Sequence, residues 1–101
     1  MSETAQSRER VLALLKRFKE RHKSEYGLTR LGIFGSFARG EAQSNSDVDI
    51  VFDTDAPNLF RTAMMKQDLE ELLGRPVDVV QVRGLTNVRL KARIEREAVY
   101  V

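Results

Sequence analysis

The sequence contains no cysteine and only one histidine, His22, among its 101 residues. The lack of cysteine excludes disulfides, thiolate catalysis and zinc sites built from cysteine, and one histidine cannot form a histidine-rich metal site. No apolar run approaches the length of a membrane span, and the polar segment 1–6 lacks the apolar core of a signal peptide. We therefore expect a cytoplasmic protein that does not enter a membrane.

The chain also lacks a strong excess of either charge. Its 17 Lys and Arg residues and 15 Asp and Glu residues give a net charge of +2, and the two signs are interspersed. A pI near 9.2 could suggest a nucleic-acid partner, but the even distribution of charge argues against direct nucleic-acid binding. The length predicts one domain over 1–101, too small to include a second substrate-binding domain.

Hydrophobic periodicity predicts alternating helices and strands. Val11, Leu15 and Phe18 recur at helical spacing within a first helix over 8–26, which Gly27 would end. The other expected elements are a strand at 28–34, a short helix at 36–41, a strand at 48–53, a helix at 58–73, a strand at 77–82 and a helix from Thr86 or Asn87, before an apolar tail at 99–101. This order predicts an α/β (α+β) fold, with a small sheet of three to four strands and flanking helices.

The same patterns predict which side chains face the core. Val48, Ile50 and Phe52 alternate along one strand and should point inward. In the two later helices, the expected core residues are Leu59, Ala63, Met64, Leu69, Leu72 and Leu73, followed by Val88, Leu90, Ile94 and Ala98. Such amphipathic helices could pack internally or against a second copy, so a homo-oligomer stays open.

Asp47 and Asp49 are spaced i, i+2 in an extended segment, so both side chains lie on the same face. Two adjacent carboxylates repel each other unless a cation lies between them. Oxygen ligands suit Mg²⁺, which takes the rest of its coordination shell from water and a nucleotide's phosphates. The alternative is an exposed turn and an edge strand whose aspartates lie in water.

The pair Gly35-Ser36 lies where a strand passes into a helix, and it favours the metal interpretation. Backbone N–H groups at such a junction can converge on a phosphate, and the Ser36 hydroxyl could add a donor. Ser46 precedes Asp47 at the entry to the strand and is a further candidate for nucleotide binding. Arg39 lies three residues beyond Ser36 and could reach a phosphate, although a structural salt bridge explains it equally well. Taken alone, the Gly35-Ser36 pair could also be a simple turn.

Asp78 lies inside an otherwise apolar strand, where an unpaired carboxylate would be costly. Strand pairing could bring it beside Asp47 and Asp49. Three carboxylates on two Mg²⁺ ions would hold an attacking hydroxyl and a nucleotide's α-phosphate in line, with Asp78 as general base. The alternative is a solvent-facing residue on an edge strand.

Taken together, these positions resemble the signature of the DNA polymerase beta-like nucleotidyltransferase superfamily, and the nearest group is the minimal nucleotidyltransferases. The matching residues are Gly35, Ser36, Arg39, Gly40, Ser46, Asp47, Asp49 and Asp78. The resemblance covers nearly the whole chain, including the closing EAVYV. It implies a palm fold in which Gly35 and Ser36 bind ATP, Asp47 and Asp49 bind both metals, and Asp78 completes one metal site.

Members of this group are often encoded beside a HEPN-domain protein, and some are antitoxins that transfer AMP from ATP to a tyrosine of that toxin. The resemblance therefore implies a protein adenylyltransferase with a HEPN-domain toxin as partner. The small size of this chain agrees with that role, because a chain with little room beyond the nucleotide and metals must obtain its acceptor from elsewhere. Two alternatives remain: a non-enzymatic module that neutralises a partner by binding it, and a nucleotidyltransferase that modifies a small molecule such as an antibiotic.

Overall fold

The computed structural model describes residues 7–43 and 45–101. The polar N-terminal segment, 1–6, and Ser44, in the polar stretch 43–46 that we expect to form a turn, lie outside the described residues. The elements in chain order are α1 (Arg8–Tyr26), β1 (Leu28–Phe34), α2 (Ser36–Arg39), β2 (Val48–Thr54), α3 (Leu59–Leu73), β3 (Val77–Gln81), α4 (Val88–Glu97) and β4 (Val99–Tyr100). The predicted elements are present, and their ends differ from prediction by at most two residues.

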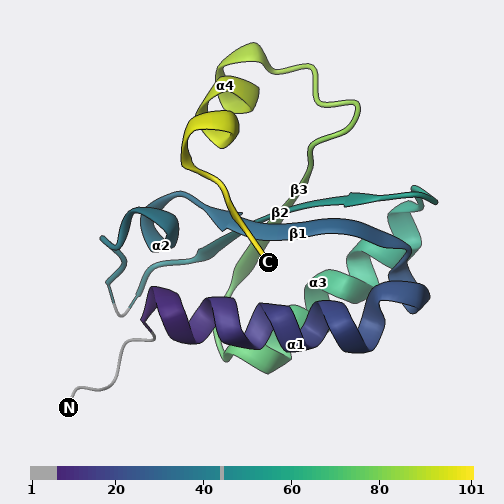
Figure 1. Cartoon of the computed structure of the whole chain (residues 1–101), viewed down its shortest axis with the longest axis horizontal. Helices are drawn as coiled ribbons and strands as arrows, with labels where there is room; N and C mark the ends of the chain where they lie inside the picture. The colour runs from purple at the N-terminus through teal and green to yellow at the C-terminus, as the bar shows by residue number, and fades with distance from the viewer. Residues whose placement is uncertain (1–6, 44) are drawn as a thin grey trace.

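The four strands form one mixed sheet in the order β3-β2-β1-β4. Strand β1 runs antiparallel to both β2 and β4, whereas β2 and β3 are parallel. Helices α1 and α3 lie against one face of the sheet, and α4 lies over the other (Figure 1). The predicted fold class is confirmed. Among the described residues, no helix is long and apolar enough to cross a membrane.

The main core lies between the sheet and the helices α1 and α3. Val48, Ile50 and Phe52 are buried there, as their alternation predicted, together with Leu15 and Phe18 from α1. The opposite face of β2 carries Asp49, Val51 and Asp53, because side chains of a strand alternate between its two faces. On that side Val51 joins Phe34 and Ile94 in a smaller apolar cluster under α4. The acidic residues of β2 therefore lie on the α4 side of the sheet.

The predicted core face of α3 is partly wrong. Leu69 and Leu73 are buried as expected, but the third buried residue is Met65, while Leu59 is 91% exposed and Ala63, Met64 and Leu72 are also exposed. Successive helical residues are rotated by about 100°, so burying Met65 turns Met64 toward solvent. This helix has more apolar residues than one face can bury, and its sequence did not identify the buried stripe.

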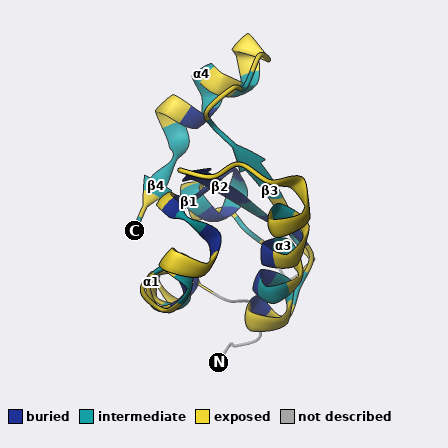
Figure 2. Ribbon diagram, turned by 90° about the vertical axis from the view of Figure 1, so that its right-hand side faces the viewer, coloured by how far each residue is buried: buried dark blue, intermediate teal, exposed yellow. Residues whose placement is uncertain are grey.

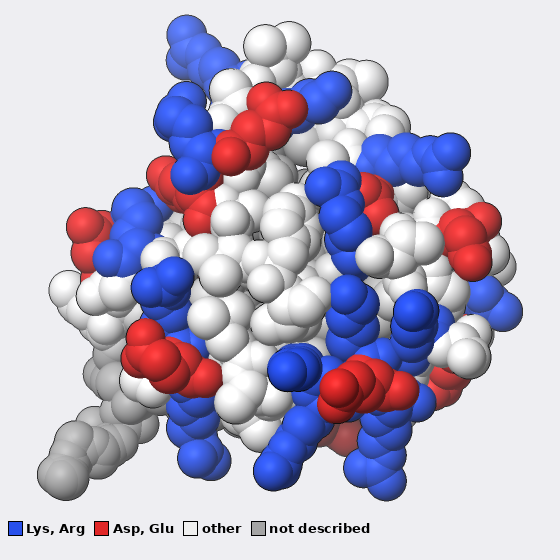
Figure 3. Space-filling view, viewed as in Figure 1, with Lys and Arg blue, Asp and Glu red and all other residues white. Residues whose placement is uncertain are grey.

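The predicted core face of α4 is also partly wrong. Ile94 is buried and Leu90 and Ala98 are partly buried, but Val88, at the first position of the helix, is 80% exposed. Figure 2 shows exposed residues alternating with partly buried ones in α4, and exposed residues along the outer side of α3. Over α1, the face in Figure 3 shows Lys and Arg side chains with Asp and Glu side chains among them.

Strand β4 was expected only as an apolar tail. It pairs with β1 through Gly32 and Ile33, which face Tyr100 and Val99. A side chain at position 32 would collide with this strand, since a Cβ there would lie 2.3 Å from the Val99 carbonyl oxygen. The close approach anchors the end of α4 to β1, and this places Glu97 near the turn that follows β1.

Candidate active site

Asp49 lies in the centre of the candidate site, because its strand β2 pairs with β3 on one side and with β1 on the other. Its Cα is paired with that of Asp78 on the parallel strand β3 and with that of Phe34 at the end of β1. Paired residues of adjacent strands point to the same face, so the two carboxylates are neighbours. Asp78 is exposed on the edge strand, and Asp47, just before β2, is also exposed. Strand pairing therefore brings Asp78 beside Asp49, as the sequence suggested.

The surroundings of Asp49 raise the pKa of its carboxyl group above the ordinary value. Burial is the largest cause, the negative charge of Asp78 is the next, and Asp47 adds a smaller effect in the same direction. Arg93 and Arg39 act in the opposite direction. Two carboxylates and two guanidinium groups thus act electrostatically on the half-buried Asp49.

A divalent cation fits this donor set chemically. Asp49 is partly desolvated, and the two neighbouring carboxylates repel it, which is the situation that a hard cation with oxygen ligands relieves. Across 7–43 and 45–101, however, no three Asp, Glu or His side chains already form a cluster able to hold a metal. The metal-binding role of Asp47, Asp49 and Asp78 therefore stays a prediction, in which the carboxylates adjust when the ion enters.

The turn at Gly35 packs directly against Asp49. Gly35 has φ 74° and ψ −151°, a conformation open essentially to glycine alone. A Cβ at this position would lie 2.2 Å from Asp49 Oδ2, so a side chain would also displace the carboxylate. Ser36 follows as the first residue of α2 and is partly buried. The glycine-serine turn and the aspartate strand, which the sequence singled out separately, meet here.

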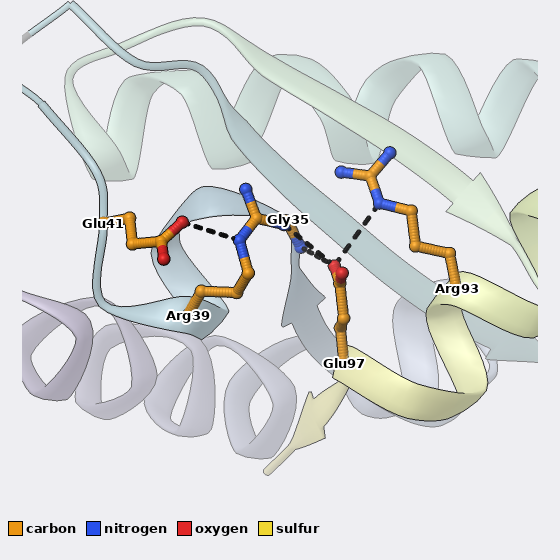
Figure 4. A network of polar contacts seen from close by, with 5 residues as sticks. All are labelled: Gly35, Arg39, Glu41, Arg93 and Glu97. Atoms are coloured by element: carbon orange, nitrogen blue, oxygen red, sulfur yellow. Dashed lines mark hydrogen bonds and ion pairs between the residues drawn. The ribbon is translucent and has the colours of Figure 1, made fainter.

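Arg39 forms salt bridges, the alternative that its sequence position left open. Its Nε donates to Glu41 Oε1 at 2.8 Å, and its Nη1 donates to Glu97 Oε1 at 3.1 Å (Figure 4). The hydrogen bond to Glu41 is the main cause that raises the pKa of Arg39 above its ordinary value. Its contact with a phosphate stays a prediction.

Ser46 shapes the turn that leads into β2. Its Oγ accepts a hydrogen bond from the Gln43 N–H at 2.8 Å, and its carbonyl oxygen accepts one from Arg75 Nη1 at 2.9 Å. Both contacts hold the backbone just before Asp47. A role for Ser46 in nucleotide binding likewise stays a prediction.

The structure adds Arg93 and Glu97 of α4 to the site, and the sequence reasoning missed both. Glu97 Oε1 accepts hydrogen bonds from the Gly35 N–H at 3.3 Å and from Arg93 Nε at 3.4 Å. The guanidinium of Arg93 also lies over the Phe34 ring, 5.8 Å from its centroid. The only sequence signal was their i, i+4 spacing, which is common to many solvent-facing helical pairs.

The family model for the nucleotidyltransferase domain matches residues 14–101. The chain belongs to this family. A relative of this nucleotidyltransferase, the protein adenylyltransferase MntA from Thermococcus cleftensis, is 37% identical over 94 residues, which cover 92% of this chain and 94% of the relative. The resemblance to a nucleotidyltransferase, drawn from the sequence, is confirmed, and the protein is an enzyme of this kind.

Two solved structures share the fold of this nucleotidyltransferase. A candidate minimal nucleotidyltransferase is 37% identical with a TM-score of 0.72, and the match covers 96% of this chain and 98% of the other. The second is a structure of a tri-AMPylated HEPN toxin from Shewanella oneidensis in complex with an MNT antitoxin. That match has a TM-score of 0.66 at 17% identity and covers 89% of this chain and 70% of the matched chain. At that identity, the second match establishes similarity of fold.

Proposed function

We propose that this nucleotidyltransferase is an antitoxin that transfers AMP from ATP to a tyrosine hydroxyl of a HEPN-domain toxin in the cytoplasm. One nucleotidyltransferase domain over 1–101 would carry the activity, with Mg²⁺ as the metal. The observation that carries the proposal is the position of Asp49, between Asp78 on one side and the Gly35 turn on the other. The protein adenylyltransferase MntA and the AMPylated toxin complex support the choice of group transferred and partner.

Each aspartate has a distinct place in this proposal. Asp47, Asp49 and Asp78 would hold the divalent ions, which when bound offset the negative charge of the triphosphate. Asp49 is half-buried and fixed between two strands, so it sets the position of the phosphates relative to the Gly35 turn. Asp78 is exposed at the sheet edge and can therefore also meet the incoming hydroxyl.

The reaction needs one bond to form and one to break. The tyrosine oxygen forms a bond to the α-phosphorus of ATP, and the bond from that phosphorus to the bridging oxygen of pyrophosphate breaks. Asp78 accepts the proton that the hydroxyl loses. The products are the AMP ester of the tyrosine and pyrophosphate.

The openness of the site favours a macromolecular acceptor. Asp47 and Asp78 are both exposed, and Asp78 lies on the edge strand, where another protein can approach without displacing a helix of this chain. A tyrosine on a partner's surface could reach these carboxylates. A small acceptor would instead need walls that hold it against them, as in the usual enclosed ligand pocket.

Incubation with ATP, Mg²⁺ and the HEPN-domain protein encoded beside this chain tests the proposal. Mass spectrometry should find AMP on a toxin tyrosine with the wild-type chain but not with Asp49→Asn. Asp55→Asn is the matched control, because Asp55 is an exposed aspartate just beyond β2 and should leave transfer unchanged. Neutralisation of the toxin by Asp49→Asn without any AMP transfer would instead show that binding alone suffices.

A further inference from the structure

A carboxylate of the chain itself occupies the Gly35 turn. Glu97 Oε1 accepts hydrogen bonds from the Gly35 N–H at 3.3 Å, from Arg39 Nη1 at 3.1 Å and from Arg93 Nε at 3.4 Å. Figure 4 shows Glu97 reaching from the end of α4 toward Arg39 on one side and Arg93 on the other. One oxygen atom thus accepts hydrogen bonds from three donors, one each in the Gly35 turn, α2 and α4.

These donors are of the kind that proteins use to bind phosphate. Guanidinium groups and backbone N–H groups form strong, charge-assisted hydrogen bonds with phosphate oxygens, and a carboxylate is a smaller anion with the same preference. Glu97 has only 19% of its side chain exposed, while Arg39 and Arg93 are 39% and 43% exposed. An incoming anion can therefore reach both arginines from solvent.

The charges and donors around Glu97 favour its negatively charged form. Burial alone would raise the pKa of Glu97, but Arg39, the Gly35 N–H and Arg93 together lower it below the ordinary value. The carboxylate is therefore charged at neutral pH and holds the arginines in place. Arg39 has a second partner in Glu41, which is 64% exposed and lies away from the turn.

The same position lies next to the predicted metal site. Gly35 packs against the Asp49 carboxylate, and the charges of Arg39 and Arg93 both act on Asp49. A nucleotide with its phosphates at Asp49 would bring further phosphate oxygens to the Gly35 turn, and would meet Glu97 there. Two anions would then compete for one set of donors.

We propose that Glu97 stands in for a nucleotide phosphate in the free protein, and that nucleotide binding transfers the Gly35 N–H, Arg39 and Arg93 from Glu97 to phosphate oxygens. This inference rests on the proposed function, because it assigns a nucleotide triphosphate to the site. It makes Arg93 a phosphate-binding residue and Glu97 an internal competitor.

Replacement of Glu97 by glutamine tests the competition directly. Glu97→Gln keeps the shape of the side chain but removes the charge, so the nucleotide no longer has to displace an anion and is no longer repelled by one. We expect the dissociation constant for Mg²⁺ and AMP-PNP to fall about threefold to tenfold, as for the loss of one competing charged contact. Arg93→Gln should weaken binding by about the same factor.

Glu95→Gln is the matched control, because it removes the same charge from the same helix. Glu95 is exposed and lines a different hollow together with Lys91 and Arg83. Isothermal titration of the full chain with AMP-PNP should give the same affinity for Glu95→Gln as for the wild type. Equal tightening by Glu95→Gln and Glu97→Gln would show a general charge effect and overturn the competition.

A second measurement uses the wild-type chain alone and does not depend on any variant folding. The NMR signal of the Gly35 amide should shift on addition of AMP-PNP with Mg²⁺, since its hydrogen-bond acceptor changes from carboxylate to phosphate. An unmoved Gly35 signal under saturating nucleotide, or binding by Glu97→Gln that is equal or weaker, would overturn the inference. If the wild type binds AMP-PNP but gives one of these contrary results, only the inference about Glu97 falls and the proposed function still stands. If the wild type binds no nucleotide, the inference and the proposed function both fall.

Discussion

The substitution Gly35→Ala tests how closely the turn and Asp49 fit together. The backbone at position 35, with φ 74° and ψ −151°, lies in a region that costs a residue with a side chain about 1–3 kcal/mol. The new Cβ would also lie 2.2 Å from Asp49 Oδ2, and relief of such an overlap costs about 1–3 kcal/mol more. We therefore expect the free energy of unfolding to fall by about 2–6 kcal/mol.

Gly74→Ala measures what a left-handed backbone alone costs a residue with a side chain. Gly74 also has a positive φ, 70°, but a Cβ there would meet no atom within 4 Å. Its replacement should cost only the left-handed conformation, about 1–2 kcal/mol. Urea denaturation of both variants measures the difference, and equal losses would refute the close fit at Gly35.

A double variant tests whether Asp49 is the colliding group. In Gly35→Ala with Asp49→Ala, the carboxylate that the new Cβ would meet is absent, so the double variant should lose less stability than the sum of the two single variants. The pair are in direct contact, and such pairs commonly couple by about 0.5–3 kcal/mol. Additive losses would show that the strain at Gly35 comes from its backbone alone.

Two further predictions concern contacts that hold the elements in register. Tyr26→Phe removes the hydroxyl that donates to Asp68 across α1 and α3 and should cost about 1 kcal/mol in a urea titration. Burial, and then Asp68, raise the pKa of the Tyr26 hydroxyl, so the unfolded chain loses this proton at a lower pH than the folded chain does. The free energy of unfolding should therefore fall as pH rises above about 10, and Tyr26→Phe should reduce that fall. An identical pH profile for the variant and the wild type would contradict the assignment. Arg30→Gln removes the 2.6 Å ion pair to the buried Asp53 and leaves the Arg83 N–H as a donor to that carboxylate. Thermal unfolding should show that the free energy of unfolding falls by about 1–3 kcal/mol. An unchanged midpoint would show that water replaces the guanidinium.

Local signals were sufficient for most of the fold. The first helix begins at Arg8 and ends at Tyr26 as predicted, because Ser7 accepts a hydrogen bond from the Arg10 N–H at one end and Gly27 takes a left-handed conformation at the other. Asn58 and Asn87 likewise cap α3 and α4 through their side chains. Capping residues and hydrophobic periodicity act over a few positions, so they can be read from the chain directly.

Features that depend on contacts between distant parts of the chain were harder to predict from the sequence. The buried stripe of α3 is decided by what the sheet presents to it, and the prediction named Met64 where the structure buries Met65. Strand β4 is too short to show an alternating pattern and depends on the lack of a side chain at Gly32. Pairing of Asp49 with Asp78 required the parallel register of β2 and β3, which the sequence could only suggest.

The candidate site shows the same division. Gly35, Asp47 and Asp49 stand out because they lie near one another in the chain and share a recognisable spacing. Arg93 and Glu97 are more than 40 positions beyond Asp49 and look like an ordinary pair on a helix surface. Only the fold of α4 over the sheet brings them to the Gly35 turn.

The central claim is that Asp47, Asp49 and Asp78 hold metal and nucleotide beside the Gly35 turn. A crystal structure with AMP-PNP and Mn²⁺ in place of Mg²⁺ tests this most directly, because anomalous scattering locates the manganese independently of the protein atoms. The account predicts manganese bound by Asp49 and Asp78 carboxylate oxygens, with a phosphate at the Gly35 N–H. Manganese and nucleotide bound elsewhere, with Asp49 and Asp78 free of both, would contradict it.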